Sequence, residues 1–292
     1  MLTYRLLKNH AGILLIGDST SLRWLHEVVH GVNERSPLVG DKEGMFLGLA
    51  YDARKAYERQ REIIQPPAHY EEMGIRYGIQ LLWPVLLLQQ RTLWPSLTYL
   101  DHSAKTQAVA YALEAIIEEA LQQDFTTQGK DAIALWQRFN PAQLDVFDKL
   151  QSRGAIFCSW TKAERKRNFL QLLTSFDPMY DSNHMFRLQR GERNLLSPGE
   201  LELWASAEWP DTRWSTATSG EPQATPYHPC LEIWPKTISQ GLQMAANTQT
   251  RVSGPPQGVA GCQRIVEELG AGVSCARRPS RASPNAARVT TY

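Results

Sequence analysis

The sequence predicts a helix-rich α+β domain over residues 1–214, with a small sheet covered by about six helices, followed by a disordered low-complexity tail over residues 215–292. Two segments have the pattern of strands, whereas most other apolar residues recur every three or four positions, as on one face of a helix. After Trp214, Ser, Thr, Gly, Pro, Ala and Gln dominate, and neither period continues. A fused or out-of-frame extension would show the same composition and the same lack of periodicity.

The first predicted element is a strand at residues 11–16, an uninterrupted apolar run that ends at Gly17. A helix is expected to follow, with its cap supplied by one of the hydroxyl residues 19–21. A second and longer helix is predicted over residues 44–64, because its apolar residues keep the helical period and a Pro-Pro pair would stop it.

The second predicted strand covers residues 73–81, where apolar side chains alternate with smaller or polar ones. The first of two Leu-Trp-Pro triplets follows directly. It predicts a helix over residues 85–93, because proline is tolerated at the first helical position. The second triplet, residues 93–95, predicts the end of that helix, since the residue before a proline avoids helical backbone.

The second half of the domain is predicted to be helical apart from one short segment. The clearest helix covers residues 103–121, and two more are expected at 129–139 and 142–152. Gly154 is placed as the C-terminal cap of the last of these, because glycine favours the left-handed backbone found there. Residues 155–160 have the composition of a short strand.

Two capping motifs predict the last helices. Thr161 is followed three residues later by Glu164, the spacing of a capping box, and opens a helix to about residue 176. Ser197 and Glu200 have the same spacing, with a proline at the first helical position between them, and open a short final helix.

Composition argues for a cytoplasmic protein without a membrane span. Hydrophobic residues make up 42% and charged residues 21%, and a net charge of +1 calls for neither nucleic acid nor an anionic membrane. The four cysteines include no Cys-x-x-Cys pair, and only Cys158 lies in the predicted domain, which fits a reducing compartment. The longest apolar run, residues 81–88, contains a proline and is far shorter than a membrane span.

Three short segments together resemble a known family. They are the strand and turn Gly12-Ile-Leu-Leu-Ile-Gly-Asp18, the helix Leu47-Gly-Leu-Ala-Tyr-Asp-Ala-Arg-Lys-Ala56 with its Tyr-Asp-x-Arg core, and Leu82-Trp-Pro84. The combination looks like a family of small bacterial proteins known only as a domain of unknown function. The resemblance covers roughly the first 100 residues and implies no activity.

A second, more local resemblance suggests a serine esterase. The turn Gly17-Asp18-Ser19 after a hydrophobic strand resembles the first block of the SGNH (GDSL-type) esterases, which implies Ser19 as nucleophile. His184 and Asp181 have that family's Asp-x-x-His spacing and would serve as general base and orienting partner. The family's Gly-x-Asn-Asp block has no match here. Alternatively, Asp18 and Ser19 only cap a helix, and residues 181–184 are a polar loop.

A third motif, His26-Glu27-Val-Val-His30, has the spacing of a zinc hydrolase site. On a helix the two imidazoles lie one turn apart on one face, and Glu27 could polarise a metal-bound water. The third ligand would be Asp52 or Glu43. In the alternative interpretation, both histidines border the apolar face of the helix, and Glu27 pairs with a neighbouring arginine, Arg23.

Basic residues gather in the last third of the domain, where a solvated helix face is a better account than a nucleic-acid contact. They are Lys162, Arg165, Lys166, Arg167, Arg187, Arg190 and Arg193. No motif carries a complete catalytic set, so the sequence does not specify a function. We expect a cytosolic interaction or regulatory protein with a protein partner and no cofactor, zinc being required only if the third motif is a site. Nucleic-acid binding is not expected.

Overall fold

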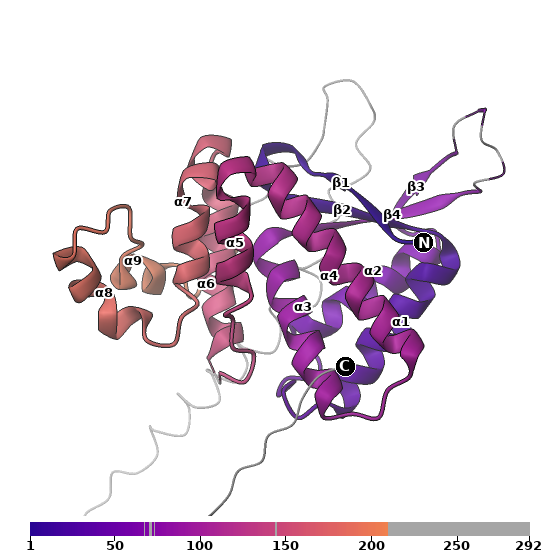
Figure 1. Cartoon of the computed structure of the whole chain (residues 1–292), viewed down its shortest axis with the longest axis horizontal. Coiled ribbons are helices and arrows are strands. Elements are labelled where there is room, and N and C mark those ends of the chain that lie inside the picture. The colour runs from indigo at the N-terminus through magenta and orange to yellow at the C-terminus, as the bar shows by residue number, and fades with distance from the viewer. Residues whose placement is uncertain (67, 70–71, 73, 144, 210–292) are drawn as a thin grey trace, which may run out of the picture. The chain divides into compact units, whose positions relative to one another are not determined.

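The computed structural model describes residues 1–66, 68–69, 72, 74–143 and 145–209 (Figure 1). These residues form one antiparallel sheet of four strands together with many helices, which confirms the predicted helix-rich α+β class. The predicted tail, residues 215–292, lies outside the described residues.

The strands stand in the spatial order β1-β2-β4-β3, and neighbouring strands are antiparallel. They are β1 (Thr3–Leu6), β2 (Gly12–Gly17), β3 (Glu62–Ile64) and β4 (Arg76–Leu82). The helices are α1 (Ser19–Arg35), α2 (Met45–Tyr57), α3 (Trp83–Thr98), α4 (Ala104–Phe125), α5 (Gly129–Trp136), α6 (Val146–Ser159), α7 (Lys162–Thr174), α8 (Tyr180–Gln189) and α9 (Pro198–Leu203). Single 3₁₀ turns, η1 (Lys8–His10) and η3 (Thr126–Gln128), follow β1 and α4.

The two predicted strands are the central strands of the sheet, β2 and β4. Their register pairs Ile13 with Leu81 and Leu15 with Ile79, and these four side chains are at most 2% exposed on the helix-covered face. Helices α2 and α4 contact β4 and β1, respectively. The edge strands β1 and β3 were not predicted. Strand β1 has four residues and β3 has three, and such short segments of mixed polarity show no clear hydrophobic period.

The helix predicted over residues 44–64 is wrong at its C-terminal end. Helix α2 ends at Tyr57, and residues Glu62–Ile64 pair with β4 instead. Arg59 adopts a left-handed backbone (φ 63°) in the turn between them. The backbone groups of residues 62–64 are satisfied by the sheet, so pairing replaces the helical hydrogen bonds that the sequence pattern suggested.

Helix α3 does not end before the second Leu-Trp-Pro triplet but runs through Pro95 to Thr98. Almost all of its side chains are buried, which explains why the run at residues 81–88 is apolar on every side. Tertiary packing therefore holds both sides of the proline in helical backbone. The hydroxyls of Thr92 and Ser96 donate to carbonyls one turn back, at 2.9 and 2.6 Å.

Gly154 is not a helix cap, and residues 155–160 do not form a strand. Both predictions are wrong because α6 runs unbroken from Val146 to Ser159. A Cβ atom at Gly154 would lie 2.0 Å from Cζ2 of Trp209, whose indole packs against the helix at this point and donates to the Gln151 side chain at 3.1 Å. Glycine is required here by close approach of an aromatic ring rather than by backbone conformation.

The capping motifs are partly confirmed. Thr161 and Glu164 form the complete capping box at the start of α7. Ser197 stands at the cap position of α9, but its side chain makes no capping hydrogen bond. At the start of α1 the cap is Asp18, which accepts from the Ser21 backbone N–H at 2.8 Å. This confirms the alternative interpretation of Asp18 as a capping residue, whereas none of residues 19–21 stands at the cap position. None of the helices formed by the described residues is long and apolar enough to cross a membrane.

Candidate functional site

The structure does not bring the three esterase candidates together. Ser19 is the first residue of α1, directly after the cap Asp18, whereas Asp181 and His184 belong to α8 and not to a polar loop. In Figure 1, α1 and α8 lie at opposite ends of the described part of the chain. The side chains of Ser19 and His184 cannot approach hydrogen-bond distance in this arrangement.

The partners of His184 also differ from those of a general base. Its side chain is buried at 9% exposure beside the ring of Tyr180, with ring centroids 5.8 Å apart. The Nδ1 atom has no hydrogen-bond partner among the described residues, so the exposed Asp181 does not orient the imidazole. The geometry therefore gives the esterase interpretation no support.

The two histidines of the zinc motif lie together as predicted. The rings of His26 and His30 are 5.5 Å apart on α1, and burial, followed by the charges of His30 and Arg54, lowers the pKa of His26. Glu27 pairs with Lys105 of α4 at 3.4 Å. The predicted partner Arg23 lies over the ring of Tyr57 instead.

Asp52 does not complete a metal site. Its carboxylate is 2% exposed and accepts from the Arg61 guanidinium at 2.7 Å, so its oxygen is already engaged. Over the residues that the structure describes, no group of three His, Cys, Asp or Glu side chains could hold a metal ion. Among the described residues the histidine pair therefore has no third ligand, whereas a structural or catalytic zinc centre needs at least three protein ligands.

Asp52 should instead make stability depend on pH. Burial raises the pKa of Asp52 to about 6, against the hydrogen bond and charge of Arg61. Since the folded chain holds this proton more tightly than the unfolded chain, the stabilisation is full below about pH 4 and is lost as the pH rises through 6. For the unaltered chain we expect the free energy of unfolding in urea to fall by on the order of 2 kcal/mol between pH 4 and pH 7 because of Asp52. Asp52→Asn should lack this part of the pH dependence. Equal pH profiles for the two proteins would contradict this assignment.

A buried polar network at the end of the sheet was not predicted. Asp124 of α4 lies 2.8 Å from His10 Nδ1 through one oxygen and accepts from the Trp83 indole N–H at 2.8 Å through the other. Both Asn9 and His10 have left-handed backbone, and the buried Arg165 donates to the Asn9 carbonyl at 3.3 Å. The network therefore ties the strained β1–β2 connection to α3, α4 and α7.

This network supplies no nucleophile. The neighbouring Cys158 is 2% exposed, and burial raises the pKa of its thiol to about 12, so the reactive thiolate does not form near neutral pH. Arg165, which the sequence placed in the basic cluster, is 1% exposed and donates to the Phe157 and Cys158 carbonyls. Burial of both side chains, and the three backbone carbonyls that accept from Arg165, give these groups a structural role.

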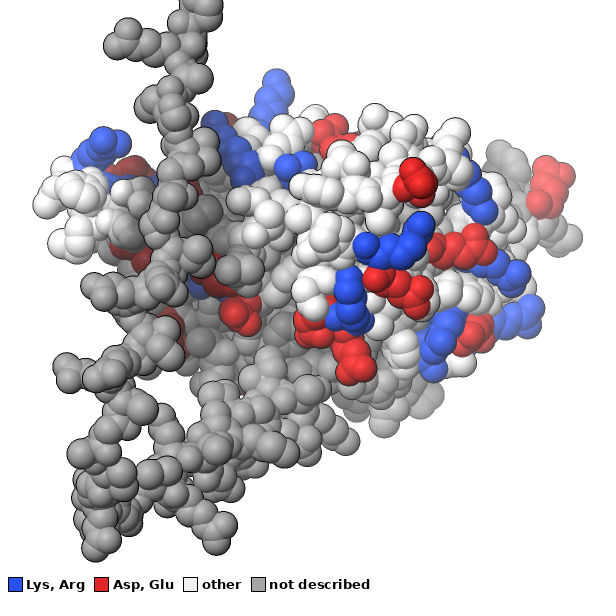
Figure 2. Space-filling model, turned by 90° about the horizontal axis from the view of Figure 1, so that it is seen from below, with Lys and Arg blue, Asp and Glu red and all other residues white. Residues whose placement is uncertain are grey.

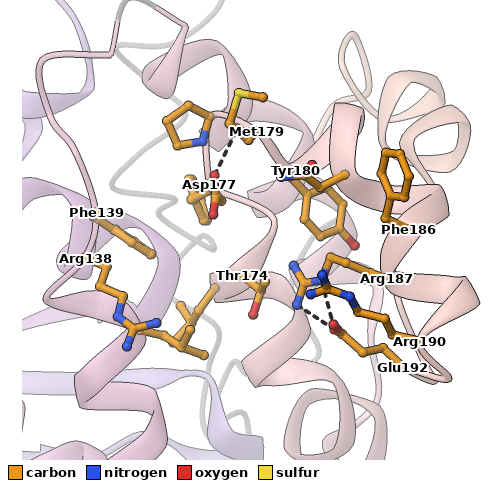
Figure 3. A pocket seen from close by; sticks show the side chains of 15 residues that line it. Arg138, Phe139, Thr174, Asp177, Met179, Tyr180, Phe186, Arg187, Arg190 and Glu192 are labelled. Atoms are coloured by element: carbon orange, nitrogen blue, oxygen red, sulfur yellow. Dashed lines mark hydrogen bonds and ion pairs between the residues drawn. The ribbon is translucent and has the colours of Figure 1, made fainter.

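A pocket of about 600 Å³ lies between the C-terminal ends of α5 and α7 and the length of α8 (Figure 3). Phe139, Leu173 and Phe176 form its apolar part, and Arg138 and Arg190 reach it from opposite sides with Thr174 between them. Its volume falls in the range of binding pockets for small molecules and short segments.

The arginines that line this pocket differ in whether they form ion pairs with described residues. Arg187 is neutralised by Glu192, with N–O distances of 2.7 and 2.8 Å. Arg138 and Arg190 are exposed and make no side-chain hydrogen bond or ion pair within the described part of the chain. On the face shown in Figure 2, by contrast, Lys and Arg are interspersed with Asp and Glu, so that face offers no continuous basic surface for a nucleic-acid backbone.

Helix α8 and the residue before it expose four large apolar side chains, of which Met179 and Phe186 line the pocket and Met185 and Leu188 do not. Met179, which precedes it, is 54% exposed, Met185 and Phe186 are each 63% exposed, and Leu188 is 44% exposed. Isolated exposed apolar residues are common on protein surfaces, whereas several on one short helix are less common. Met179, Asn183, Phe186 and Arg190 all line the pocket, and their spacing of four, three and four residues places them on one stripe.

Comparison with known proteins gives a family but no activity. The family model described as "Domain of unknown function (DUF6904)" matches residues 2–214. The chain belongs to this family. No curated protein and no solved structure shows a significant match to the chain. The resemblance noted in the sequence is thereby confirmed at the level of an uncharacterised family, over a longer stretch than the first 100 residues.

The pocket of this DUF6904 domain was missed in the sequence, although a signal was present. The segment from Met179 to Arg190 has the four-three-four spacing of a helix face. On sequence alone, residues 181–184 are interpreted only as an Asp-x-x-His motif or a polar loop. The predicted basic cluster contains Arg187 and Arg190 together with residues of α7, but it does not contain Arg138, which also lines the pocket. The helical period of this segment is the signal in the sequence that predicts the stripe.

Proposed function

We propose that this DUF6904 domain is a protein-interaction module, and that the pocket and the stripe on α8 form its binding surface. The observation that carries the proposal is the exposure of Met179 and Phe186, 54% and 63%, at the rim of a preformed pocket. Burying two such side chains against a partner removes a large apolar area from water. Aromatic and methionine residues are also enriched at the centres of protein interfaces.

Other features of the domain agree with binding rather than catalysis. The buried carboxylates of Asp52 and Asp124 are engaged in hydrogen bonds within the fold, and the buried His184 forms no hydrogen bond to a nucleophile among the described residues. A cytoplasmic location and a regulatory role through the bound partner are part of this proposal. The near-neutral charge supports them, as does the buried Cys158, which forms no disulfide with a described residue.

The test uses a displayed library of random 16-residue peptides, selected on the purified full-length chain. We expect peptides whose affinity falls at least about tenfold for Phe186→Ser, because buried aromatic residues dominate interface energies. The matched control is Leu203→Ser on α9, a side chain that is 81% exposed and outside the pocket. If Phe186→Ser binds the selected peptides as well as the control does, or if no peptide is selected, the proposal is wrong.

A further inference from the structure

We infer that the occupant of this surface is an acidic amphipathic helix, whose apolar face covers Phe186 and whose carboxylates lie between Arg138 and Arg190. The inference rests on the proposed function and specifies the chemistry of the partner. It is carried by a separate observation, the pairing of charges in the pocket.

Of the three arginines that line the pocket, only one is neutralised. Glu192 satisfies Arg187, while Asp177 accepts from the Met179 backbone N–H at 2.8 Å and makes no ion pair with Arg138 or Arg190. Two guanidinium groups, those of Arg138 and Arg190, therefore line the pocket beside the carboxylates of Asp177 and Glu192 without forming an ion pair to a described residue. Guanidinium forms strong, bidentate hydrogen bonds with carboxylates, so an acidic side chain is the chemistry that complements this lining.

The stripe on α8 indicates the shape of the occupant. Residues Met179 to Arg190 span about 16 Å at the helical rise of 1.5 Å per residue, which corresponds to three turns of a partner helix. A helix that lies along the stripe presents its own residues at the same three- and four-residue spacing. Its apolar residues would meet Met179 and Phe186, and its acidic residues would meet the Arg190 end.

A segment of a protein fits this surface better than a small anion does. A small ligand is largely enclosed by its pocket, with most of its surface buried by the walls. Here Phe186 and Met179 stand more than half exposed at the rim, where only an occupant larger than the pocket would cover them. A single helical segment would then pair its carboxylates with the arginines of the pocket and cover Phe186 and Met179 at the rim with its apolar residues.

Charge reversal tests the inference in the same peptide selection. On the unaltered chain we expect selected peptides with more Asp and Glu than the unselected library, next to apolar residues at helical spacing. The variants Arg190→Glu and Arg138→Glu should shift the selection toward Lys and Arg, because the complementary charge is inverted. Arg167→Glu on α7, an exposed arginine outside the pocket lining, is the matched control and should leave the acidic preference unchanged.

The outcomes separate the two proposals. The inference is wrong if the selected peptides depend on Phe186 but show no preference for acidic residues. It is also wrong if the acidic preference persists on the Arg190→Glu and Arg138→Glu variants. In both cases the proposed function as a protein-interaction module is still supported. If the peptides do not depend on Phe186, the proposed function itself fails. Circular dichroism of each charge-reversed variant verifies its fold, and a variant that is unfolded is replaced by Arg190→Ala, which should weaken acidic peptides about tenfold without inverting the preference.

Discussion

Replacing Asp124 by alanine is expected to lower the free energy of unfolding by about 3–5 kcal/mol, which would be one of the largest effects of any single substitution in the chain. The carboxylate is 8% exposed and serves two partners, the His10 imidazole and the Trp83 indole N–H. Alanine leaves the fully buried indole N–H without an acceptor and removes the partner that holds His10 in left-handed backbone.

Two comparison variants isolate this effect. Asp124→Asn keeps the side-chain shape and one acceptor oxygen, so it should cost only about 1–2 kcal/mol. Gln122→Ala changes an exposed residue of the same helix and should stay within about 0.5 kcal/mol of the unaltered chain. Urea unfolding followed by circular dichroism measures all three. A loss below about 1 kcal/mol for Asp124→Ala would show that the network contributes little to the fold.

Gly154→Ala is expected to destabilise the domain by about 3–5 kcal/mol, although alanine is the better helix former by about 1 kcal/mol. The new methyl group would lie 2.0 Å from the Trp209 ring, so the indole has to leave its site on α6. Its departure exposes a side chain that is 4% exposed in the structure and breaks its hydrogen bond to Gln151. The cost is therefore that of removing a buried tryptophan.

A double-mutant cycle decides between packing and helix propensity. In a Trp209→Ala background, Gly154→Ala no longer meets the indole and should stabilise the helix by up to about 1 kcal/mol. The sign of the effect therefore reverses between the two backgrounds. If Gly154→Ala stabilises the otherwise unaltered chain, Trp209 does not pack on α6 as described.

Local signals in the sequence were sufficient for most of the fold. The central strands β2 and β4 and the capping box of α7 were predicted because burial, alternation and capping act within a few residues. The errors lie where distant residues decide. Pairing with β4 turns residues 62–64 into a strand, and packing of Trp209 keeps Gly154 inside a helix.

The candidate site was harder to predict for the same reason. A catalytic triad or a metal site is recognised by residue type and spacing, and the sequence offered such patterns at Ser19 and at His26 with His30. Whether their partners lie nearby depends on tertiary structure, which places His184 on a distant helix and pairs Asp52 with Arg61. The helical spacing of the stripe on α8 is visible in the sequence, but the pocket beside it and the pairing of its charges depend on tertiary structure.

Methyl NMR of the methionine side chains tests the central claim, the binding surface on α8, most directly. The chain has six methionines, of which Met179 lines the pocket and Met45 is buried at 7% exposure in α2. On titration with an acidic peptide selected on the unaltered chain, the Met179 signal should shift and saturate at one peptide per chain, while the Met45 signal stays in place. A peptide that binds while the Met179 signal remains unchanged would contradict the account.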